Sequence, residues 1–210
     1  VEVLDGEHDW GSIEPGTRNA LCARLQGAAL EVAIAHAKQG HIEAITTAPW
    51  TKEIFRLIDA SPTGHTEVLA EAFEAPEHVM MLAGPRLRVA LATVHVPLAR
   101  VSQELTQDRL RQVIETTARD LRRLFGVEVP RIAICGLNPH AGEHGVMGTE
   151  EAEVIRPTLE ACAAELGGAA ELVGPLPSDT LFGAFRQGQP YDAVVCMYHD
   201  QGLIPLKLLH

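Results

Sequence analysis

Three histidines stand out as residues that could do chemistry together. His95, His140 and His199 each follow a strongly apolar segment by one to four residues. The carboxyl ends of parallel strands lie at one edge of a sheet, so these side chains are expected near one another. Three neutral imidazoles with one open coordination position are a recurrent way to hold a catalytic zinc or similar divalent ion. Separate hydrogen-bonding histidines remain the alternative interpretation of the same spacing.

Two charged residues near His199 extend this candidate site. Asp200 follows it directly, and a carboxylate beside a metal-binding histidine can orient the imidazole or relay a proton. Lys207 lies eight residues past His199 in an apolar run. Its ammonium group either reaches solvent or holds an anionic group of a substrate.

A glycine-rich run over residues 142–148 leads into a predicted helix. Its backbone amides could face an anion, and a plain connecting turn fits the same residues equally well. Within the run, His144 could compete with His140 for a ligand role. We interpret Glu150 and Glu151, which follow the run, as charges that favour a helix start.

The segments that must position these residues alternate short apolar runs with longer amphipathic ones, which is typical of an α/β fold with a substantially parallel sheet. We expect strands over residues 42–47, 79–82, 87–94, 131–136, 192–197 and 203–208, the second and third forming an antiparallel hairpin. We expect helices over residues 17–39, 49–58, 66–73, 107–125 and 149–166, the last with a kink or restart at Pro157. Ser178 or Asp179 should cap a further helix.

Composition limits the classes of protein that fit. The 210 residues are 46% hydrophobic and 21% charged, which excludes general disorder. A net charge of −11 argues against nucleic acid or an anionic membrane surface as the main partner, and no apolar run is long enough for a membrane span. Four scattered cysteines without a CxxC motif are expected to be free thiols in a cytoplasmic protein.

Several long motifs resemble the 4-hydroxythreonine-4-phosphate dehydrogenase family of pyridoxine biosynthesis. The resemblance runs in order from about residue 17 to the end, and two of its strings are very specific: Asn138-Pro-His-Ala-Gly-Glu143 and Tyr198-His-Asp-Gln-Gly202. The other matching residues are Thr47-Ala-Pro49 with Lys52, Gly64-His-Thr-Glu67, Leu91 to Leu98, Gly148-Thr-Glu-Glu151 and Gly174 to Phe182.

The resemblance implies a fold, an activity and roles for particular residues. The fold is a mixed, largely parallel sheet flanked by helices, as in isocitrate and isopropylmalate dehydrogenases. His95, His140 and His199 would bind a divalent metal (Zn, Mg or Co), and His65, Thr66 and Lys207 would contact the substrate. Family enzymes use NAD to oxidise the carbon-3 hydroxyl of 4-phosphooxy-L-threonine, and the product decarboxylates to 3-amino-2-oxopropyl phosphate.

The family is further expected to act as a homodimer with the active site at the subunit interface. One of the three metal-binding histidines, with His199 as the first candidate, would then come from the partner. The chain is expected to be a portion, residues 1–210, of a two-domain dehydrogenase, without a clear internal boundary in its sequence. The rest of the family pattern, including most of the nucleotide site, would lie outside it.

The chemistry of the histidines agrees with this resemblance. A bound divalent ion lowers the pKa of coordinated water from about 15.7 to about 7 and should act similarly on an alcohol. Three alternatives remain open: a dehydrogenase of another four-carbon phosphorylated hydroxy acid, a phosphate acyltransferase on a similar fold, and a non-catalytic metal- or phosphate-binding module. The acyltransferase fits the three histidines poorly because its chemistry needs no metal.

Overall fold

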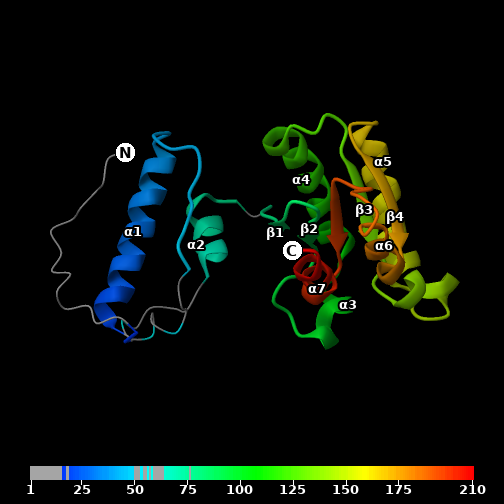
Figure 1. Ribbon diagram of the computed structural model, residues 1–210, viewed down its shortest axis with the longest axis horizontal. Coiled ribbons are helices and arrows are strands. Elements are labelled where there is room, and N and C mark those ends of the chain that lie inside the picture. The colour runs from blue at the N-terminus through cyan, green and yellow to red at the C-terminus, as the bar shows by residue number, and fades with distance from the viewer. Residues whose placement is uncertain are drawn as a thin grey trace. The chain divides into compact units, whose positions relative to one another are not determined.

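The computed structural model describes residues 16–17, 19–49, 53, 56, 58, 64–75 and 77–210. The chain divides into two compact units, Val1–Pro76 and Glu77–His210 (Figure 1). Most of the expected helix over 49–58, and Lys52 of the family motif, lie outside the described residues.

Among its described residues, the first unit has two helices at the expected places. Helix α1 spans Ala20–Lys38 and is capped by Asn19, whose side chain accepts a hydrogen bond from the amide of Leu21 at 2.7 Å. Helix α2 spans His65–Ala72. The strand expected over 42–47 is wrong: these residues are mostly exposed and form no ladder. A strand needs a paired neighbour, and all strands of the described residues lie in the second unit.

The second unit is built on a five-stranded sheet. Its strands are β1 (Met81–Ala83), β2 (Arg88–Leu91), β3 (Arg131–Cys135), β4 (Glu171–Leu176) and β5 (Ala193–Cys196). They lie in the order β1-β2-β5-β3-β4, with β1 antiparallel to β2 and all other pairs parallel. This confirms the mixed, largely parallel sheet and the hairpin. Strand β4 was missed because Gly174 and Pro175 indicate a turn, although an edge strand tolerates proline.

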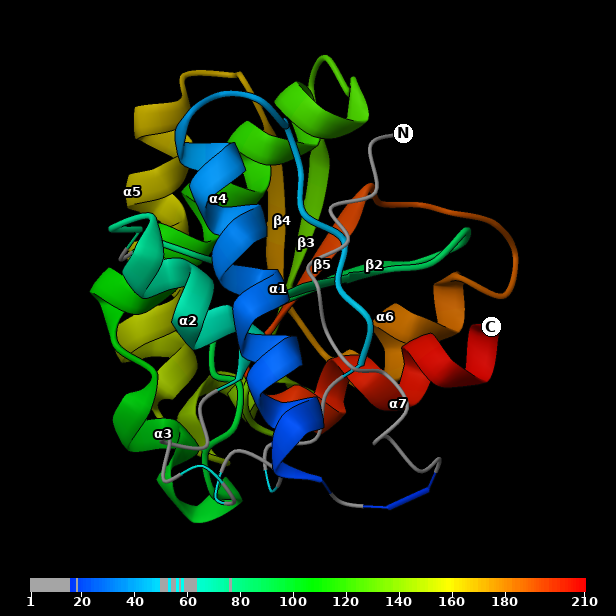
Figure 2. The same ribbon diagram turned by 90° about the vertical axis from the view of Figure 1, so that its left-hand side faces the viewer.

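Helices cover both faces of this sheet (Figures 1 and 2). Helices α4 (Gln107–Phe125) and α5 (Arg156–Leu166) lie on one face, and α6 (Ser178–Ala184) and α7 (His199–Leu209) on the other. Alternate strand residues divide between two cores: Ile132 and Ile134 pack with α4 and α5, whereas Ala133 and Cys135 pack with α6 and α7. The shorter elements are η3 (Leu98–Arg100), α3 (Val101–Glu104), η4 (Pro139–Gly145) and η5 (Glu151–Ile155).

Helix α4 shows why a local pattern could be read correctly. Thr106 caps it, its Oγ1 accepting from the amide of Arg109 at 3.2 Å, and Gly126 ends it in a left-handed conformation with φ of 69°. The helical region over 149–166 is also confirmed. It begins as the π-helical turn η5 and continues as α5, with Pro157 in the first turn where a proline is tolerated.

Helix α7 corrects the strand that was expected over 203–208. The buried residues Leu203 and Leu206 are three apart, which is helical rather than strand spacing. A short apolar run cannot separate the two possibilities by itself. The consequence is that Lys207 lies in the last turn of a helix that begins at His199, and not in a strand.

Two further features concern the whole described chain. All four cysteines are free, and Cys135, Cys162 and Cys196 are buried. Among the described residues, none of the helices combines the length and apolar character needed to cross a membrane.

Candidate functional site

The three strands that precede the candidate histidines are neighbours in the sheet. In the order β2-β5-β3, they lead to His95, His199 and His140 respectively. Beyond the ladder, the amide of Thr93 donates to the carbonyl oxygen of Met197 at 3.2 Å, and its Oγ1 donates to the same oxygen at 2.7 Å. The carboxyl ends of β2 and β5 are therefore fixed to each other just before their histidines.

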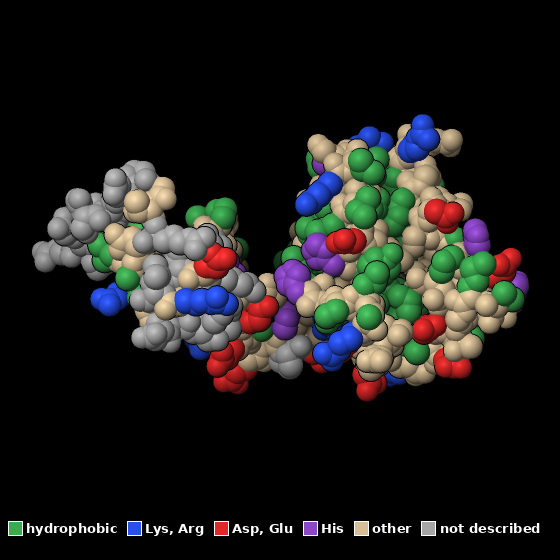
Figure 3. Space-filling view, turned by 90° about the horizontal axis from the view of Figure 1, so that it is seen from below, with side chains coloured by type: hydrophobic (Ala, Val, Ile, Leu, Met, Phe, Trp, Pro, Cys, Tyr) green, Lys and Arg blue, Asp and Glu red, His purple; other side chains and the backbone are tan. Residues whose placement is uncertain are grey.

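His95 and His199 come together at this edge. Their ring centroids are 5.6 Å apart and the ring planes are inclined by 44°. His95 is exposed, and the side chain of His199 is one-third exposed at 33%. Figure 3 looks onto the end of the unit at which α3 and α7 lie, where histidines and hydrophobic side chains are exposed together. Both rings are thus accessible to a ligand.

Asp200 fixes the protonation of the His199 ring. Nδ1 of His199 and Oδ1 of Asp200 are 2.7 Å apart. An ionised carboxylate can only accept a hydrogen bond, so Nδ1 carries the proton and donates. The lone pair of Nε2 is then left for a metal ion, the arrangement by which a carboxylate orients a ligating histidine.

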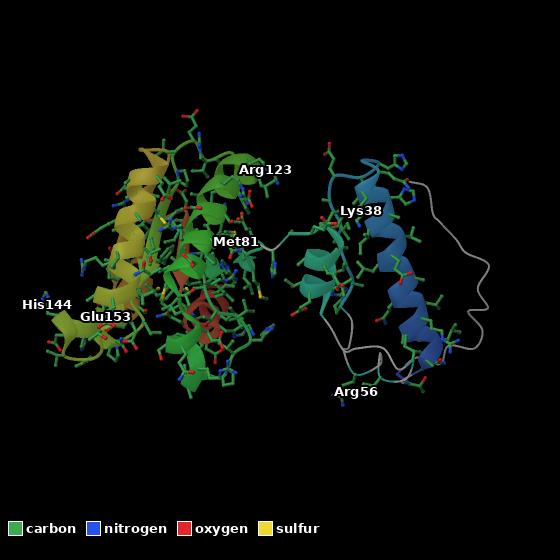
Figure 4. All side chains as sticks on the ribbon, turned by 180° about the vertical axis from the view of Figure 1, so that it is seen from behind. Lys38, Arg56, Met81, Arg123, His144 and Glu153 are labelled. Carbon is green, nitrogen blue, oxygen red and sulfur yellow. The ribbon has the colours of Figure 1, made fainter. Side chains whose placement is uncertain are left out.

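His140 lies elsewhere, in the η4 segment. It lines a pocket of about 560 Å³ together with His144, Glu143 and Arg156. His140, Ala141, Glu143 and His144 all have φ between 42° and 57°, so the backbone makes a left-handed turn here. Figure 4 shows His144 at the tip of this segment, with Glu153 near the start of the helix that follows.

No three His, Cys, Asp or Glu side chains converge on one point within the residues that the structure describes. Within one chain, His95 and His199 therefore lie together and His140 does not join them. Within one chain the ring of His199 lies beside that of His95, and the supply of His199 by a second subunit stays a prediction.

The paired rings nevertheless suit a divalent ion. A zinc ion about 2.1 Å from each nitrogen would lie about 3 Å from each ring centroid, so two rings that share it lie about 5 Å apart. The observed 5.6 Å is close to this separation. Two imidazoles, one of them hydrogen-bonded to a carboxylate, are a donor set that would suit a divalent ion.

Glu151 was misjudged from the sequence as a simple helix-start charge. Its side chain is buried, with 4% of the residue exposed. Oε1 accepts hydrogen bonds from the amides of Leu137 at 2.8 Å and Asn138 at 2.7 Å, and Oε2 accepts from Nδ2 of Asn138 at 3.0 Å. Glu150 is likewise more than a helix-start charge, since its Oε2 accepts a hydrogen bond from the same Nδ2 of Asn138 at 2.7 Å.

Gln201 is a second polar residue that sequence reasoning missed. It is buried, and its side chain joins the ends of β3 and β5 to Ser178 at the start of α6. Ser178 itself is the first helical residue, and neither it nor Asp179 caps α6, whose N-cap is Pro177. The only available sequence signal for Gln201 was its place within the specific Tyr198-His-Asp-Gln-Gly202 string.

The Cys196 and Tyr198 side chains next to this edge of the sheet are uncharged. Burial raises the pKa of the Cys196 thiol well above its usual value, and a hydrogen bond with Cys135 adds to the effect. Burial also raises the pKa of the Tyr198 phenol, with smaller contributions from nearby Cys135 and Asp200. Both shifts favour the neutral forms of the thiol and the phenol.

The substrate residues that the resemblance implies lie in separate places. His65 and Thr66 open helix α2 of the first unit. Lys207 is exposed in the last turn of α7 in the second unit. The common cleft expected for these three residues stays a prediction, because the residues belong to different units.

Comparison with known proteins agrees with these motifs. All 210 residues match the family model of pyridoxal phosphate biosynthetic protein PdxA. The 4-hydroxythreonine-4-phosphate dehydrogenase of Desulforapulum autotrophicum is 42% identical over 95% of the chain and 56% of its own length. That of Geobacter metallireducens is 51% identical over 82% of the chain and 49% of its length.

Solved structures share the fold. The crystal structure of 4-hydroxythreonine-4-phosphate dehydrogenase from Klebsiella pneumoniae superposes with a TM-score of 0.84 at 42% identity, over 95% of this chain and 59% of that one. A terephthalate 1,2-cis-dihydrodiol dehydrogenase from Burkholderia xenovorans reaches 0.71 at 28% identity, over 95% and 62%. The chain thus spans roughly half to three-fifths of the length of these relatives.

Proposed function

Because the chain belongs to the PdxA family of pyridoxal phosphate biosynthetic proteins, we propose that it forms the metal-binding part of a 4-hydroxythreonine-4-phosphate dehydrogenase. The substrate is 4-phosphooxy-L-threonine, and hydride passes from its carbon 3 to NAD while the hydroxyl proton leaves to a base. The resulting β-keto acid loses its carboxylate as carbon dioxide and takes up a proton. The product is 3-amino-2-oxopropyl phosphate.

The observation that carries this proposal is the His95–His199 pair, with Asp200 bonded to Nδ1 of His199. The two Nε2 atoms, together with His140, form the proposed ligand set for Zn, Mg or Co. When bound, the ion supplies positive charge that lowers the pKa of the alcohol and stabilises negative charge after carbon dioxide leaves. Asp200 keeps His199 in the tautomer that can bind the ion, and its carboxylate is the group that we propose to relay the alcohol proton.

The remaining parts of the proposal concern substrate, assembly and location. His65, Thr66 and Lys207 hold the small phosphorylated substrate. The Lys207 ammonium suits this role because it is a point charge that can bind an anionic group. His140 lies away from the pair within one chain, so a site completed in a homodimer accounts for its separation. The protein works in the cytoplasm, where its four free thiols stay reduced.

A second candidate is a dehydrogenase of a different secondary alcohol. It is favoured by the similarity to the dihydrodiol dehydrogenase, which shows that this fold serves dehydrogenases with unrelated substrates. Threonate or erythronate phosphates are further candidates of this kind. A phosphate acyltransferase fits less well, since the paired histidines have no role in that reaction.

The test is NADH formation by the full-length protein. We expect NADH to form on addition of 4-phosphooxy-L-threonine, to stop with a chelator and to resume when a divalent metal is returned. NADH formation with a threonate phosphate or a cis-dihydrodiol, and none with 4-phosphooxy-L-threonine, would assign the second candidate. Acyl transfer that survives the chelator would overturn both dehydrogenase assignments.

A further inference from the structure

Two segments that follow neighbouring strands present His140 and His199. We call residues 136–148 the His140 loop and residues 197–200 the His199 turn. Each segment is held by one buried polar side chain that comes from a neighbouring helical turn: Glu151 of η5 holds the His140 loop, and Gln201 of α7 holds the His199 turn. Both residues are buried away from bulk solvent, so neither is in a position to contact a substrate.

Glu151 fixes the first residues of the His140 loop. Its two oxygens accept three hydrogen bonds, from the amides of Leu137 and Asn138 and from the Asn138 side chain, all between 2.7 and 3.0 Å. These residues directly precede Pro139 and His140. Because both oxygens of this buried side chain accept hydrogen bonds from the loop, Glu151 sets the direction in which the loop leaves β3.

Glycines pack closely against this carboxylate. A methyl group at Gly142 would lie 2.6 Å from Oε2 of Glu151, and φ of +79° disfavours any side chain there. A methyl group at Gly136 would lie 3.1 Å from Oε1. The close approach of Glu151 therefore explains the glycine at position 142 of the glycine-rich run.

Gln201 connects the two segments. Its Oε1 accepts from the amide of Met197 at 2.6 Å, while Nε2 donates to the carbonyl oxygen of Gly136 at 2.7 Å and to Oγ of Ser178 at 2.8 Å. The amide N–H of Met197 needs an acceptor and the carbonyl oxygen of Gly136 needs a donor, so the orientation of the Gln201 side-chain amide is fixed. Glutamate, of the same shape, could accept from Met197 but could not donate to Gly136.

We propose that Glu151 and Gln201 are positioning residues, which hold the His140 loop and the His199 turn in the arrangement that metal binding requires. This inference rests on the proposed function, because it assigns the two residues to the histidine ligand set. A merely structural role would lower stability when they are changed and leave metal binding by the folded protein intact.

The experiment uses the full-length protein as it assembles, with Co(II) as the probe. The variants are Glu151→Gln and Gln201→Glu, which keep the size of the side chain and change its hydrogen-bonding capacity and its charge. Matched controls are Glu160→Gln and Gln187→Glu, at exposed positions of the same unit. Calorimetric titration gives the Co(II) affinity, the visible absorption bands of bound Co(II) report its coordination geometry, and thermal unfolding reports stability.

We expect both variants to bind Co(II) about 10–100-fold more weakly, as changes behind metal ligands commonly do, with shifted absorption bands. The controls should stay within about twofold. Faster amide hydrogen exchange at Leu137 and Asn138 in Glu151→Gln would locate the change in the His140 loop. If a variant does not fold, Asn138→Ala and Ser178→Ala remove fewer hydrogen bonds from each network. They should show the same changes in Co(II) affinity and absorption bands, but smaller ones.

The outcomes separate this inference from the proposed function. Unaltered affinity and bands in variants with a lowered melting temperature would make Glu151 and Gln201 structural and overturn the inference. Failure of the unaltered protein to bind Co(II) would instead remove the metal site, and with it the basis of both proposals.

Discussion

The imidazole rings of His95 and His199 lie 5.6 Å apart between centroids, although they follow different strands of the sheet. The parallel pairing of β2 with β5 sets this relationship, because Leu91 is in register with Cys196 and both strands end at this pair. Two imidazoles at this distance could share one metal ion. The strongest tests of the proposed function therefore concern these two residues.

His95→Ala and His199→Ala should each weaken Zn or Co(II) binding more than about 100-fold, since changes merely behind a ligand already cost about 10–100-fold. The measurement is calorimetric titration of the metal-free protein. His41→Ala, at an exposed position of the first unit, is the control and should leave binding unchanged. Equal binding by all three variants would show that the paired histidines are not ligands.

Asp200→Asn tests the orientation of His199. Removing the charge weakens the hold on Nδ1, so metal affinity should fall by about 10–100-fold. Stability should change by less than about 0.5 kcal/mol, because the Asp200 side chain is 71% exposed. Titration and thermal unfolding measure the two effects. A large loss of stability with unchanged affinity would reverse the assignment.

Lys207→Ala tests the proposed anionic contact. Loss of one charge-assisted hydrogen bond, worth about 1.5–3 kcal/mol, should raise KM for the phosphorylated substrate about 10–100-fold. Folding should be unaffected, because Lys207 is exposed. Initial rates of NADH formation by the full-length protein give KM, and Lys38→Ala, at an exposed lysine in α1, is the control. An unchanged KM would remove Lys207 from the site.

Leu110→Ala and Leu124→Ala test the packing of α4. Leu110 is fully buried between the helix and the sheet, so its truncation should destabilise the protein by about 2–5 kcal/mol. Leu124 is 64% exposed on the same helix, and its truncation should stay within about 0.5 kcal/mol. Denaturant unfolding measures both. Similar losses for the two variants would contradict the orientation of α4.

Glu115 gives the chain a pH-dependent stability. Burial, followed by a hydrogen bond and repulsion from Glu165, raises the pKa of the Glu115 carboxyl. The folded state then binds this proton more tightly than the unfolded state, so stability falls as pH rises through the raised pKa. Glu115→Gln should remove this loss.

We expect Glu115→Gln to raise the melting temperature at pH 7 by about 1–3 °C and to leave it unchanged at pH 4, where the native carboxyl is protonated. Thermal unfolding across that pH range is the measurement, with Glu160→Gln as an exposed control on α5. A lower melting temperature at pH 7 would give the opposite sign for the Glu115 interaction.

The sequence by itself determined the elements whose signals are local. Helix α4 has its apolar stripe, its cap at Thr106 and its terminating Gly126 within one short segment. Strand β3 and the hairpin of β1 and β2 were equally readable, and the specific strings around His140 and His199 identified the family. Each of these depends on neighbouring residues, which a pattern can show.

The tertiary structure alone decided which side chains meet. The sheet order places β5 between β2 and β3. This order brings His199 beside His95, while His140 lines the pocket of the η4 segment. It also buries Glu151 and Gln201 among backbone groups of distant segments, and it makes residues 199–209 a helix because Leu203 and Leu206 face the sheet. Such contacts follow from strand order and helix packing between segments far apart in the chain, and no local spacing of residue types encodes them.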